Sequence, residues 1–432
     1  MQRRIFLKSG ALALVTIGLS PRFLRRAVLL AESQAASRGK TLICLFQRGA
    51  ADALNVVVPH GDPFYYSLRP SIAIAAPSRA AATAGALDLD GFFGLHPALA
   101  PLMPLYQRGM LAPIHAVGSP SSTRSHFDAQ DFMETATPDN KATRDGWLNR
   151  LLRATDHDAS ARLAAAGAGA GAGTATALPA SLRGIALGAQ APRALEGSAP
   201  MIALRSLEEL RVRAGGADAA QLESLYQSMG ADLVHGDGAD AREATRILRS
   251  LDPASYAPAN GADYPRSDFG RRLEQIAQLV KADVGMEIAF ADVGGWDTHV
   301  NQGGATGQLA GRLDDFGRAI AALVTDLGER MSDVVILTMS EFGRMARENG
   351  NRGTDHGHAG AMLAIGGNVR GGRVYGRWPG LAPDQLYEGR DLALTTDFRS
   401  VFSEIAQRHM GAARSEALFP GFAGGAATLG IV

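Results

Sequence analysis

The sequence predicts an α/β protein built around a mostly parallel sheet that helices cover on both faces. Short runs that are apolar throughout recur along the chain, as expected of strands buried on both faces. Amphipathic stretches separate these runs, which is typical of strand–helix–strand units. Polar clusters directly follow several of the runs, at the strand ends where parallel sheets bind their ligands.

Six apolar runs are predicted to form strands. They are Lys40–Phe46, Leu111–Val117, Ile185–Leu187, Met286–Val293, Val334–Met339 and Ala361–Ile365. The predicted helices are Pro97–Arg108, Ala219–Ser250, Phe269–Ala282, Leu309–Arg330 and Phe398–His409. No internal repeat and no clear boundary interrupts this series, so we expect a single domain over residues 40–432.

Two segments are predicted to lie outside the regular elements. Leu163–Leu178 is an Ala/Gly tract with too little apolar bulk to pack, and we expect a flexible insertion there. Ala257–Asp268 is rich in Pro, Asn and Asp and is predicted to be a loop.

Residues 1–36 are predicted to be a twin-arginine export signal. The pair Arg3-Arg4 is followed by Ile-Phe-Leu-Lys, and the apolar run Ala11–Leu19 is too short to span a bilayer. Small residues between about Ala31 and Ala36 offer a cleavage region. The competing interpretation is a basic amphipathic N-terminal helix. We expect export by the twin-arginine translocase, a periplasmic or secreted location and no permanent membrane span.

Charge and cysteine content narrow the function classes. The chain holds 43 basic and 43 acidic residues, and cleavage after Ala36 would leave 37 against 42, a net charge of −5. Such a protein lacks the basic surface that nucleic acids require, so we expect no nucleic-acid partner. Cys44 is the only cysteine, which excludes an intrachain disulfide, and its apolar run predicts a core residue.

The densest group of metal-ligand residue types is Thr-Asp-His-Gly-His. It places Asp355, His356 and His358 within four positions, in a Gly/Asn/Arg-rich loop just before a predicted strand. Carboxylates and imidazoles gathered from loops are the groups that hold divalent metal ions. This segment therefore predicts a metal site.

Two further clusters follow predicted strands. In Gly-Trp-Asp-Thr-His, Asp297 and His299 face one side of an extended backbone, so both can bind one ion, or one can orient the other. The alternative is a helix-capping Asp297 beside a surface His299. In Ser-Glu-Phe-Gly-Arg, Glu341 is a candidate ligand, and Arg344 either holds it or receives an anionic substrate group. The alternative is a buried Glu341–Arg344 ion pair.

Two clusters nearer the N-terminus complete the candidate site. Asp52 follows the first strand among small residues that let a ligand approach, although it could equally be a turn aspartate. In Ser-Ser-Thr-Arg-Ser-His-Phe-Asp, the hydroxyl of Thr123 or Ser125, beside Arg124, is poised at a helix N-terminus to attack or receive an anion. The competing interpretation is a helix N-cap by Ser125 with Asp128 in the first turn.

Together these motifs resemble a known family. Arg-Gly-x-x-Asp, Ser-His-Phe-Asp-Ala-Gln, Gly-Trp-Asp-Thr-His, Ser-Glu-Phe-Gly-Arg and Asp-His-Gly-His occur in the order found in the bacterial family called domain of unknown function 1501. The resemblance runs from about Thr41 to His409. That family is grouped by similarity with the alkaline phosphatase-like superfamily of phosphatases, sulfatases and phosphomutases. The resemblance implies one α/β domain of that fold with metal ions at the strand ends.

The resemblance also implies roles for the residues. Ser125 or Thr123 stands in the region of the nucleophile, and the metal ligands would be Asp52, Asp297, His299, Glu341, Asp355, His356 and His358. Four hydroxyl residues crowd the nucleophile region, and Glu341 stands where the superfamily has an Asp-His pair. One or two ions are therefore both compatible with the sequence, and zinc, manganese and calcium are the candidates.

These inferences predict an exported, metal-dependent hydrolase of phosphate or sulfate esters that acts on a small anionic substrate. Ser125 would attack phosphorus or sulfur, and Arg344 or Arg124 would stabilise the charge that develops on the ester oxygens. The alternative is a non-catalytic exported protein of the same fold that binds metal in the cell envelope.

Overall fold

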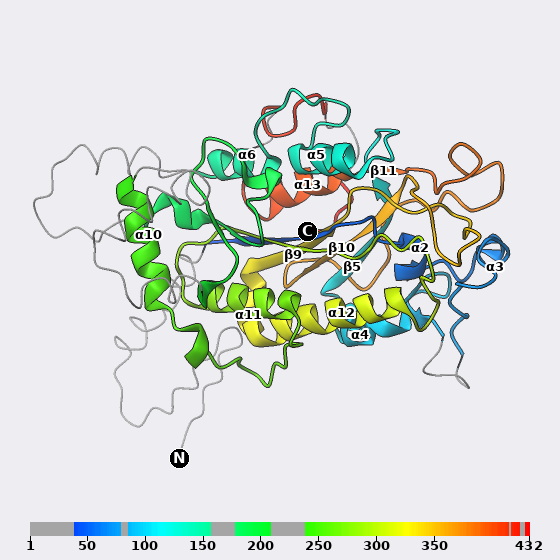
Figure 1. The fold of residues 1–432 in the computed structure, drawn as a ribbon, viewed down its shortest axis with the longest axis horizontal. Coiled ribbons are helices and arrows are strands. Elements are labelled where there is room, and N and C mark those ends of the chain that lie inside the picture. Colours follow the sequence, from blue (N-terminus) through cyan, green and yellow to red (C-terminus); the bar gives the residue numbers. More distant parts are fainter. Residues whose placement is uncertain (1–38, 79–84, 157–177, 209–237, 414–415, 424–427) are drawn as a thin grey trace, which may run out of the picture.

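The computed structural model describes residues 39–78, 85–156, 178–208, 238–413, 416–423 and 428–432 (Figure 1). The predicted export signal lies outside these residues, as does the predicted Ala/Gly insertion except for Leu178. No helix within the described ranges is long and apolar enough to cross a membrane.

The centre of the fold is a sheet of eight strands in the order β11-β5-β10-β9-β1-β8-β6-β7. Their bounds are β1 (Thr41–Gln47), β5 (Leu111–Gly118), β6 (Gly184–Leu187), β7 (Ile202–Leu204), β8 (Ile288–Val293), β9 (Val334–Met339), β10 (Gly360–Gly366) and β11 (Thr396–Asp397). Only β10 runs antiparallel to its neighbours, β5 and β9. The prediction of an α/β protein with a mostly parallel sheet is confirmed.

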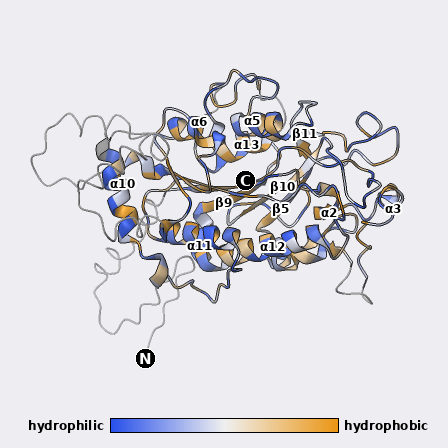
Figure 2. Cartoon of the chain, in the orientation of Figure 1, coloured by the Kyte–Doolittle hydropathy of each residue, from blue (hydrophilic) through white to orange (hydrophobic). Residues whose placement is uncertain are grey.

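Helices lie on both faces of this sheet (Figure 1). One layer contains α4 (Met103–Gln107), α11 (Asp268–Lys281) and α12 (Gln308–Leu327); the other contains α5 (His126–Thr135), α6 (Trp147–Ala154) and α13 (Phe398–Arg408). Figure 2 shows mostly hydrophobic strands between helices of mixed character. Alternate residues of β1 serve the two layers: Ile43 and Leu45 pack in one core cluster, Leu42 and Cys44 in the other.

The remaining elements complete the described fold. They are α2 (Ala53–Val56), α3 (Pro63–Leu68), α10 (Gly238–Ser250), a small sheet of β2 (Val57–Val58), β3 (Leu87–Asp88) and β4 (Gly94–Leu95), and 3-10 turns at Pro97–Leu102, Ala180–Arg183, Arg193–Leu195, Pro253–Ser255 and Gly328–Asp333. The predicted loop over residues 257–268 contains no regular element until α11 begins at Asp268.

All six predicted strands are present, within two residues at each end. The predicted helix Pro97–Arg108 is instead a 3-10 turn followed by the short α4, because Pro101 and Pro104 remove backbone donors that a continuous α-helix needs. Of the predicted helix over residues 219–250, only the part from residue 238 is described, and it is helical. Two short strands, β7 and β11, and helix α6 were not predicted.

The strand directions bring the polar clusters to one edge of the sheet. The loops after β1, β5, β8 and β9 leave the edge at which these strands end, which we call the carboxyl edge. Because β10 is antiparallel, the loop before it also lies at the carboxyl edge. All five candidate segments therefore start from the same side of the fold.

Candidate metal centre

Two glycines let the loop after β9 and the loop before β10 pair closely. The amide of Gly343 donates to the His358 carbonyl at 2.8 Å, and the amide of Gly357 donates to the Gly343 carbonyl at 2.9 Å. A Cβ at Gly343 would lie 1.8 Å from the Ala359 oxygen, and one at Gly357 would lie 2.3 Å from the Arg344 carbonyl carbon. The glycines in Ser-Glu-Phe-Gly-Arg and Asp-His-Gly-His thus hold the two motifs together.

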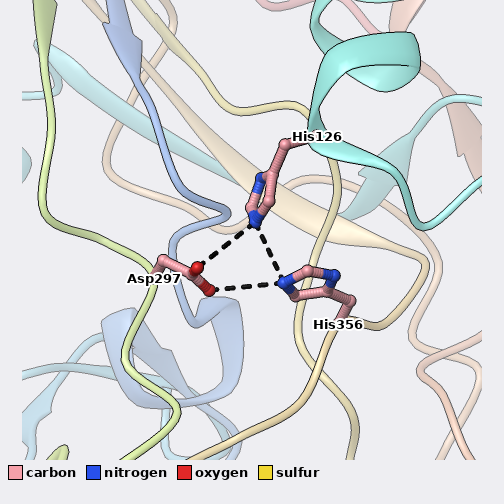
Figure 3. Close-up of side chains that lie close together, drawn as sticks. All are labelled: His126, Asp297 and His356. Atoms are coloured by element: carbon pink, nitrogen blue, oxygen red, sulfur yellow. Dashed lines mark hydrogen bonds and ion pairs between the residues drawn. The ribbon is translucent and has the colours of Figure 1, made fainter.

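Three side chains from distant parts of the chain converge at the carboxyl edge (Figure 3). His126 begins α5, Asp297 lies in the loop after β8, and His356 lies in the loop before β10. The Nε2 atoms of His126 and His356 are 2.9 Å apart. Asp297 places Oδ2 3.5 Å from Nε2 of His126 and Oδ1 3.3 Å from Nε2 of His356. Their ligand atoms all lie within 4.8 Å of one another.

His299 adds a fourth donor to this group. Its Nε2 lies 2.9 Å from Oδ1 of Asp297 and 3.0 Å from Nε2 of His356. Two ligands about 2.1 Å from a tetrahedral zinc ion are roughly 3.4 Å apart, close to the separations observed between neighbouring donors here. We call His126, Asp297, His299 and His356 the four-residue cluster; the first, second and fourth converge mutually, and His299 joins them through Asp297 and His356.

Each imidazole of the cluster is oriented by a hydrogen bond at Nδ1. The pairs are His126 with Oε1 of Glu341 at 2.8 Å, His299 with Oδ1 of Asp355 at 3.1 Å, and His356 with the carbonyl oxygen of Arg124 at 2.9 Å. Ionised carboxylates and carbonyls only accept hydrogen bonds, so each Nδ1 must carry the proton and donate it. Each neutral ring therefore presents a lone pair at Nε2. Metal-binding histidines are typically oriented in this way.

This arrangement of lone pairs favours a shared cation. The Nε2 atom of His356 lies within 3.0 Å of the Nε2 atoms of both His126 and His299, and unshielded lone pairs at such distances repel. One proton can relieve only one of the two contacts, whereas one divalent ion accepts all three lone pairs and the carboxylate. Three imidazoles and one carboxylate suit zinc, while calcium prefers oxygen ligands alone. The residues present therefore fit a transition-metal ion.

Neighbouring charges keep the carboxylates of the site ionised. Burial is the largest single influence on the pKa of Asp297 and would raise it, but the 2.5 Å hydrogen bond from Arg344 and the charge of Arg344, together with the nearby histidines, lower this pKa. The pKa of Asp355 is lowered mainly by a hydrogen bond from Asn349. The pKa of His126 is raised by its hydrogen bond to Glu341, and that of His356 is lowered by burial.

Glu341 lies behind the cluster and orients it. The side chain is fully buried and its Oε1 accepts hydrogen bonds from the Gly49 amide at 2.7 Å and from Gln130 at 3.0 Å, besides that from His126. Burial would raise the pKa of Glu341, but these donors lower it below its usual value. Glu341 and Asp355 were predicted as ligands; the structure places them one step away, on the Nδ1 atoms of two histidines of the four-residue cluster.

The two predicted substrate-binding arginines hold protein groups instead. Arg344 is buried, and its guanidinium donates to four backbone carbonyls as well as to Asp297. Arg124 donates to Asp391 and Glu388, both at 2.6 Å. The structure thus differs from the expectation that either guanidinium meets a substrate, because the donors of both are directed at protein acceptors.

Asp52 and His358 also lie outside the group of converging atoms. Asp52 is fully buried, and its Oδ2 accepts hydrogen bonds from Arg69 and Gln302, each at 2.6 Å. The ring of His358 stacks on that of Tyr387 with centroids 4.2 Å apart, and burial lowers its pKa. Both were predicted as ligands; the arginine and the tyrosine hold them in other contacts.

The candidate nucleophile stands directly before a cluster residue. Ser125 precedes His126 and is exposed, and as the N-cap residue of α5 it makes no side-chain capping hydrogen bond, unlike the capping interpretation of this segment. The Thr123 hydroxyl accepts from the Ser125 amide at 3.2 Å, and the Ser121 hydroxyl donates to Asp139 at 2.6 Å. Of these three hydroxyls, that of Ser125 makes the fewest hydrogen bonds to other protein groups in the described part of the chain.

The prediction missed one member of the four-residue cluster. His126 was present in the Ser-His-Phe-Asp segment, but that segment was interpreted through its hydroxyls. The available signal was positional: His126 follows the end of a buried strand, as Asp297 does, and sits at the first position of a helix.

Comparison with known proteins places the chain in a family. It belongs to the family described as protein of unknown function (DUF1501), which it matches over residues 39–418. No curated protein matches the chain. Among solved structures it is similar to the crystal structure of PsFucS1 sulfatase from Pseudoalteromonas sp., at 12% sequence identity and a TM-score of 0.34. That match covers 91% of this chain and 72% of the sulfatase chain.

Proposed function

We propose that this member of the family is an exported, metal-dependent hydrolase of phosphate or sulfate esters. The observation that carries the proposal is the convergence of three imidazole Nε2 atoms and one carboxylate at the carboxyl edge of the sheet. We further propose an alkaline phosphatase-like domain over residues 40–432, on the basis of the motif order described above. Catalytic sites in sheets of this kind lie at that edge.

The donor set favours zinc, with manganese as the second choice. A divalent ion held by the cluster would offset the charge of the transferred group and lower the pKa of an attacking hydroxyl. Because Arg69 already neutralises Asp52 at 2.6 Å, we propose one ion per chain rather than two. The chain's own contribution is to hold each imidazole with Nε2 directed inward.

Ser125 is the proposed nucleophile. Its Oγ would form a bond to phosphorus or sulfur while the bond to the ester's alcohol oxygen breaks, and the hydroxyl proton would leave with the alcohol. Water would then cleave the bond to Oγ and release phosphate or sulfate. Arg344 would serve this reaction by holding Asp297, and Arg124 by holding the segment of Glu388 and Asp391, since their guanidinium groups are directed at protein acceptors.

Export remains part of the proposal. Residues 1–36 would direct the chain to the twin-arginine translocase and be removed, which gives a periplasmic or secreted protein. This route carries folded proteins, so the ion could be bound before transport. A net charge near −5 after cleavage supports a small-molecule substrate rather than a nucleic acid.

A second candidate function is a metal-binding protein without catalysis. One observation favours it: among the described residues, no side chain accepts a hydrogen bond from the Ser125 hydroxyl, so no general base is in place to take its proton. Such a protein would keep the fold and the ion and act by binding in the cell envelope.

Elemental analysis combined with a substrate screen separates these functions. We expect one zinc or manganese ion per purified chain and turnover of at least one class of phosphate or sulfate mono- or diester. Ser125→Ala should lower that turnover by several orders of magnitude. The matched control Ser122→Ala, at an exposed serine three residues away, should leave it unchanged. Metal without turnover on any ester would select the second function, and the lack of metal would refute both.

A further inference from the structure

Two exposed apolar side chains directly follow ligands of the four-residue cluster. The large apolar residues that stay exposed in the described part of the chain are Phe64, Phe127, Leu178 and Val300. Phe127 follows His126 and is 90% exposed, the largest fraction of the four. Val300 follows His299 and is 51% exposed. Half of this small group therefore borders the candidate metal centre.

A lone exposed apolar residue needs no explanation, but this pair comes from two separate elements. Phe127 lies in the first turn of α5, and Val300 lies in the loop after β8. The histidines that precede them both direct Nε2 at His356, at 2.9 and 3.0 Å. Because consecutive Cα atoms are about 3.8 Å apart, the backbones of both apolar residues are held near one centre.

The charged groups around this centre also favour a ligand that carries an apolar part. The side chains of Asp297 and Asp355 are 43% and 50% exposed, and the partly exposed Arg390 beside them donates to the His356 carbonyl. The guanidinium groups of Arg124 and Arg344 are directed at protein acceptors. Recognition beyond the ion would thus come from apolar contact rather than from additional positive charge.

We infer that the site accepts esters whose alcohol part carries an aromatic or branched aliphatic group. That group packs on Phe127 and Val300 while the anionic group faces the four-residue cluster. The contribution of these residues is to substrate binding, through apolar area removed from water. The inference rests on the proposed hydrolase and names its substrate class.

Binding of two non-hydrolysable phosphonates to the zinc-loaded protein tests the inference. Phenylphosphonate and methylphosphonate share the anionic group and differ in the apolar part. By calorimetry we expect phenylphosphonate to bind about tenfold more tightly. Phe127→Ala should bring this ratio close to one and leave both the affinity for methylphosphonate and the zinc content unchanged. Val300→Ser should lower the ratio less, because Val300 has the smaller side chain.

Leu178→Ala is the matched control, because Leu178 is an exposed apolar residue whose side chain a Cβ at Gly285 would approach within 3.0 Å, and Gly285 lies before the start of β8, toward the opposite edge of the sheet. It should keep the wild-type ratio. Equal affinity of the wild-type protein for both phosphonates, or an unchanged ratio in Phe127→Ala, would overturn the inference that the substrate carries an apolar alcohol part. Neither result would contradict the proposed hydrolase function. If zinc-loaded protein bound neither phosphonate, the ester-binding function would fail together with this inference.

Discussion

Two groups of polar residues at the same edge of the sheet satisfy their charges in opposite ways. In the first, Arg69 donates from Nη1 to Oδ2 of Asp52 at 2.6 Å, and both side chains are fully buried. Other guanidinium donors of Arg69 reach the carbonyls of Met345 and Ala346. The chain itself therefore supplies the cation. In the second group, the four-residue cluster, Nε2 of His356 lies within 3.0 Å of Nε2 of both His126 and His299, while the arginine contact of the cluster, from Arg344, is to the carboxylate of Asp297.

The difference shows why residue type alone does not identify a metal ligand. Asp52 follows a buried strand, as Asp297 does, and both carboxylates contact an arginine. Among the described residues, the side chains that donate to the Asp52 carboxylate are Arg69 and Gln302, neither an imidazole, whereas Asp297 directs Oδ2 toward Nε2 of His126 at 3.5 Å. A carboxylate becomes a ligand candidate when imidazole donors converge on it, even where an arginine also contacts it.

The largest effect should come from His356→Ala, because the Nε2 atom of His356 contacts both other imidazoles of the cluster. We expect the variant to lose its ion, a greater loss than the roughly 10–100-fold in affinity that an orienting partner contributes. Elemental analysis after gel filtration measures this. His358→Ala is the matched control two residues away, and it should keep the ion because its ring stacks on Tyr387. If His358→Ala lost the ion while His356→Ala kept it, His358 rather than His356 would be the ligand.

Arg69→Ala tests the other side of the comparison. Removing the guanidinium leaves a buried carboxylate without its cation, which costs about 3–5 kcal/mol of folding free energy. Urea denaturation should show this loss, while the folded variant should still bind one ion per chain. If the variant had wild-type stability but lost its ion, the Asp52–Arg69 pair would not be separate from the metal centre, and Asp52 would belong to it.

The sequence predicted much of the fold because its strands carry a local signal. Runs such as Val334–Met339 are apolar throughout and stay buried on both faces of the sheet. The strands β7 and β11 have three and two residues, too few to show any period. The segment that begins at Pro97, predicted to be an α-helix, forms a 3-10 turn because its prolines lack the backbone N–H donors of a continuous α-helix.

The candidate site was only partly predictable, because its contacts join residues far apart in the chain. The clusters containing Asp297 and His356 were found from their positions beside strand ends. Which histidine each carboxylate orients could not be predicted: Asp355 is adjacent to His356, yet it accepts from His299. The partner of Asp52, Arg69, lies 17 residues away in a segment without a ligand motif. Such pairings depend on the folded arrangement of the loops.

The smallest of the expected effects concerns this orienting contact. Asp355→Ala removes the acceptor at Nδ1 of His299, so the ring is free to rotate and to change tautomer, and metal affinity should fall about 10–100-fold. Competition with a chromophoric chelator measures that change. Asp355 is half exposed, so its replacement should leave the folding free energy nearly unchanged.

Asp384→Ala, at an exposed carboxylate in another loop, is the control for the lost negative charge and should leave the affinity as it is. The outcome also separates orienting groups from ligands. With excess metal, Asp355→Ala should recover one ion per chain, because all four donors of the cluster remain, whereas His356→Ala should not. If excess metal failed to restore the ion in Asp355→Ala, then Asp355 would itself be a ligand, and the cluster would have five members rather than four.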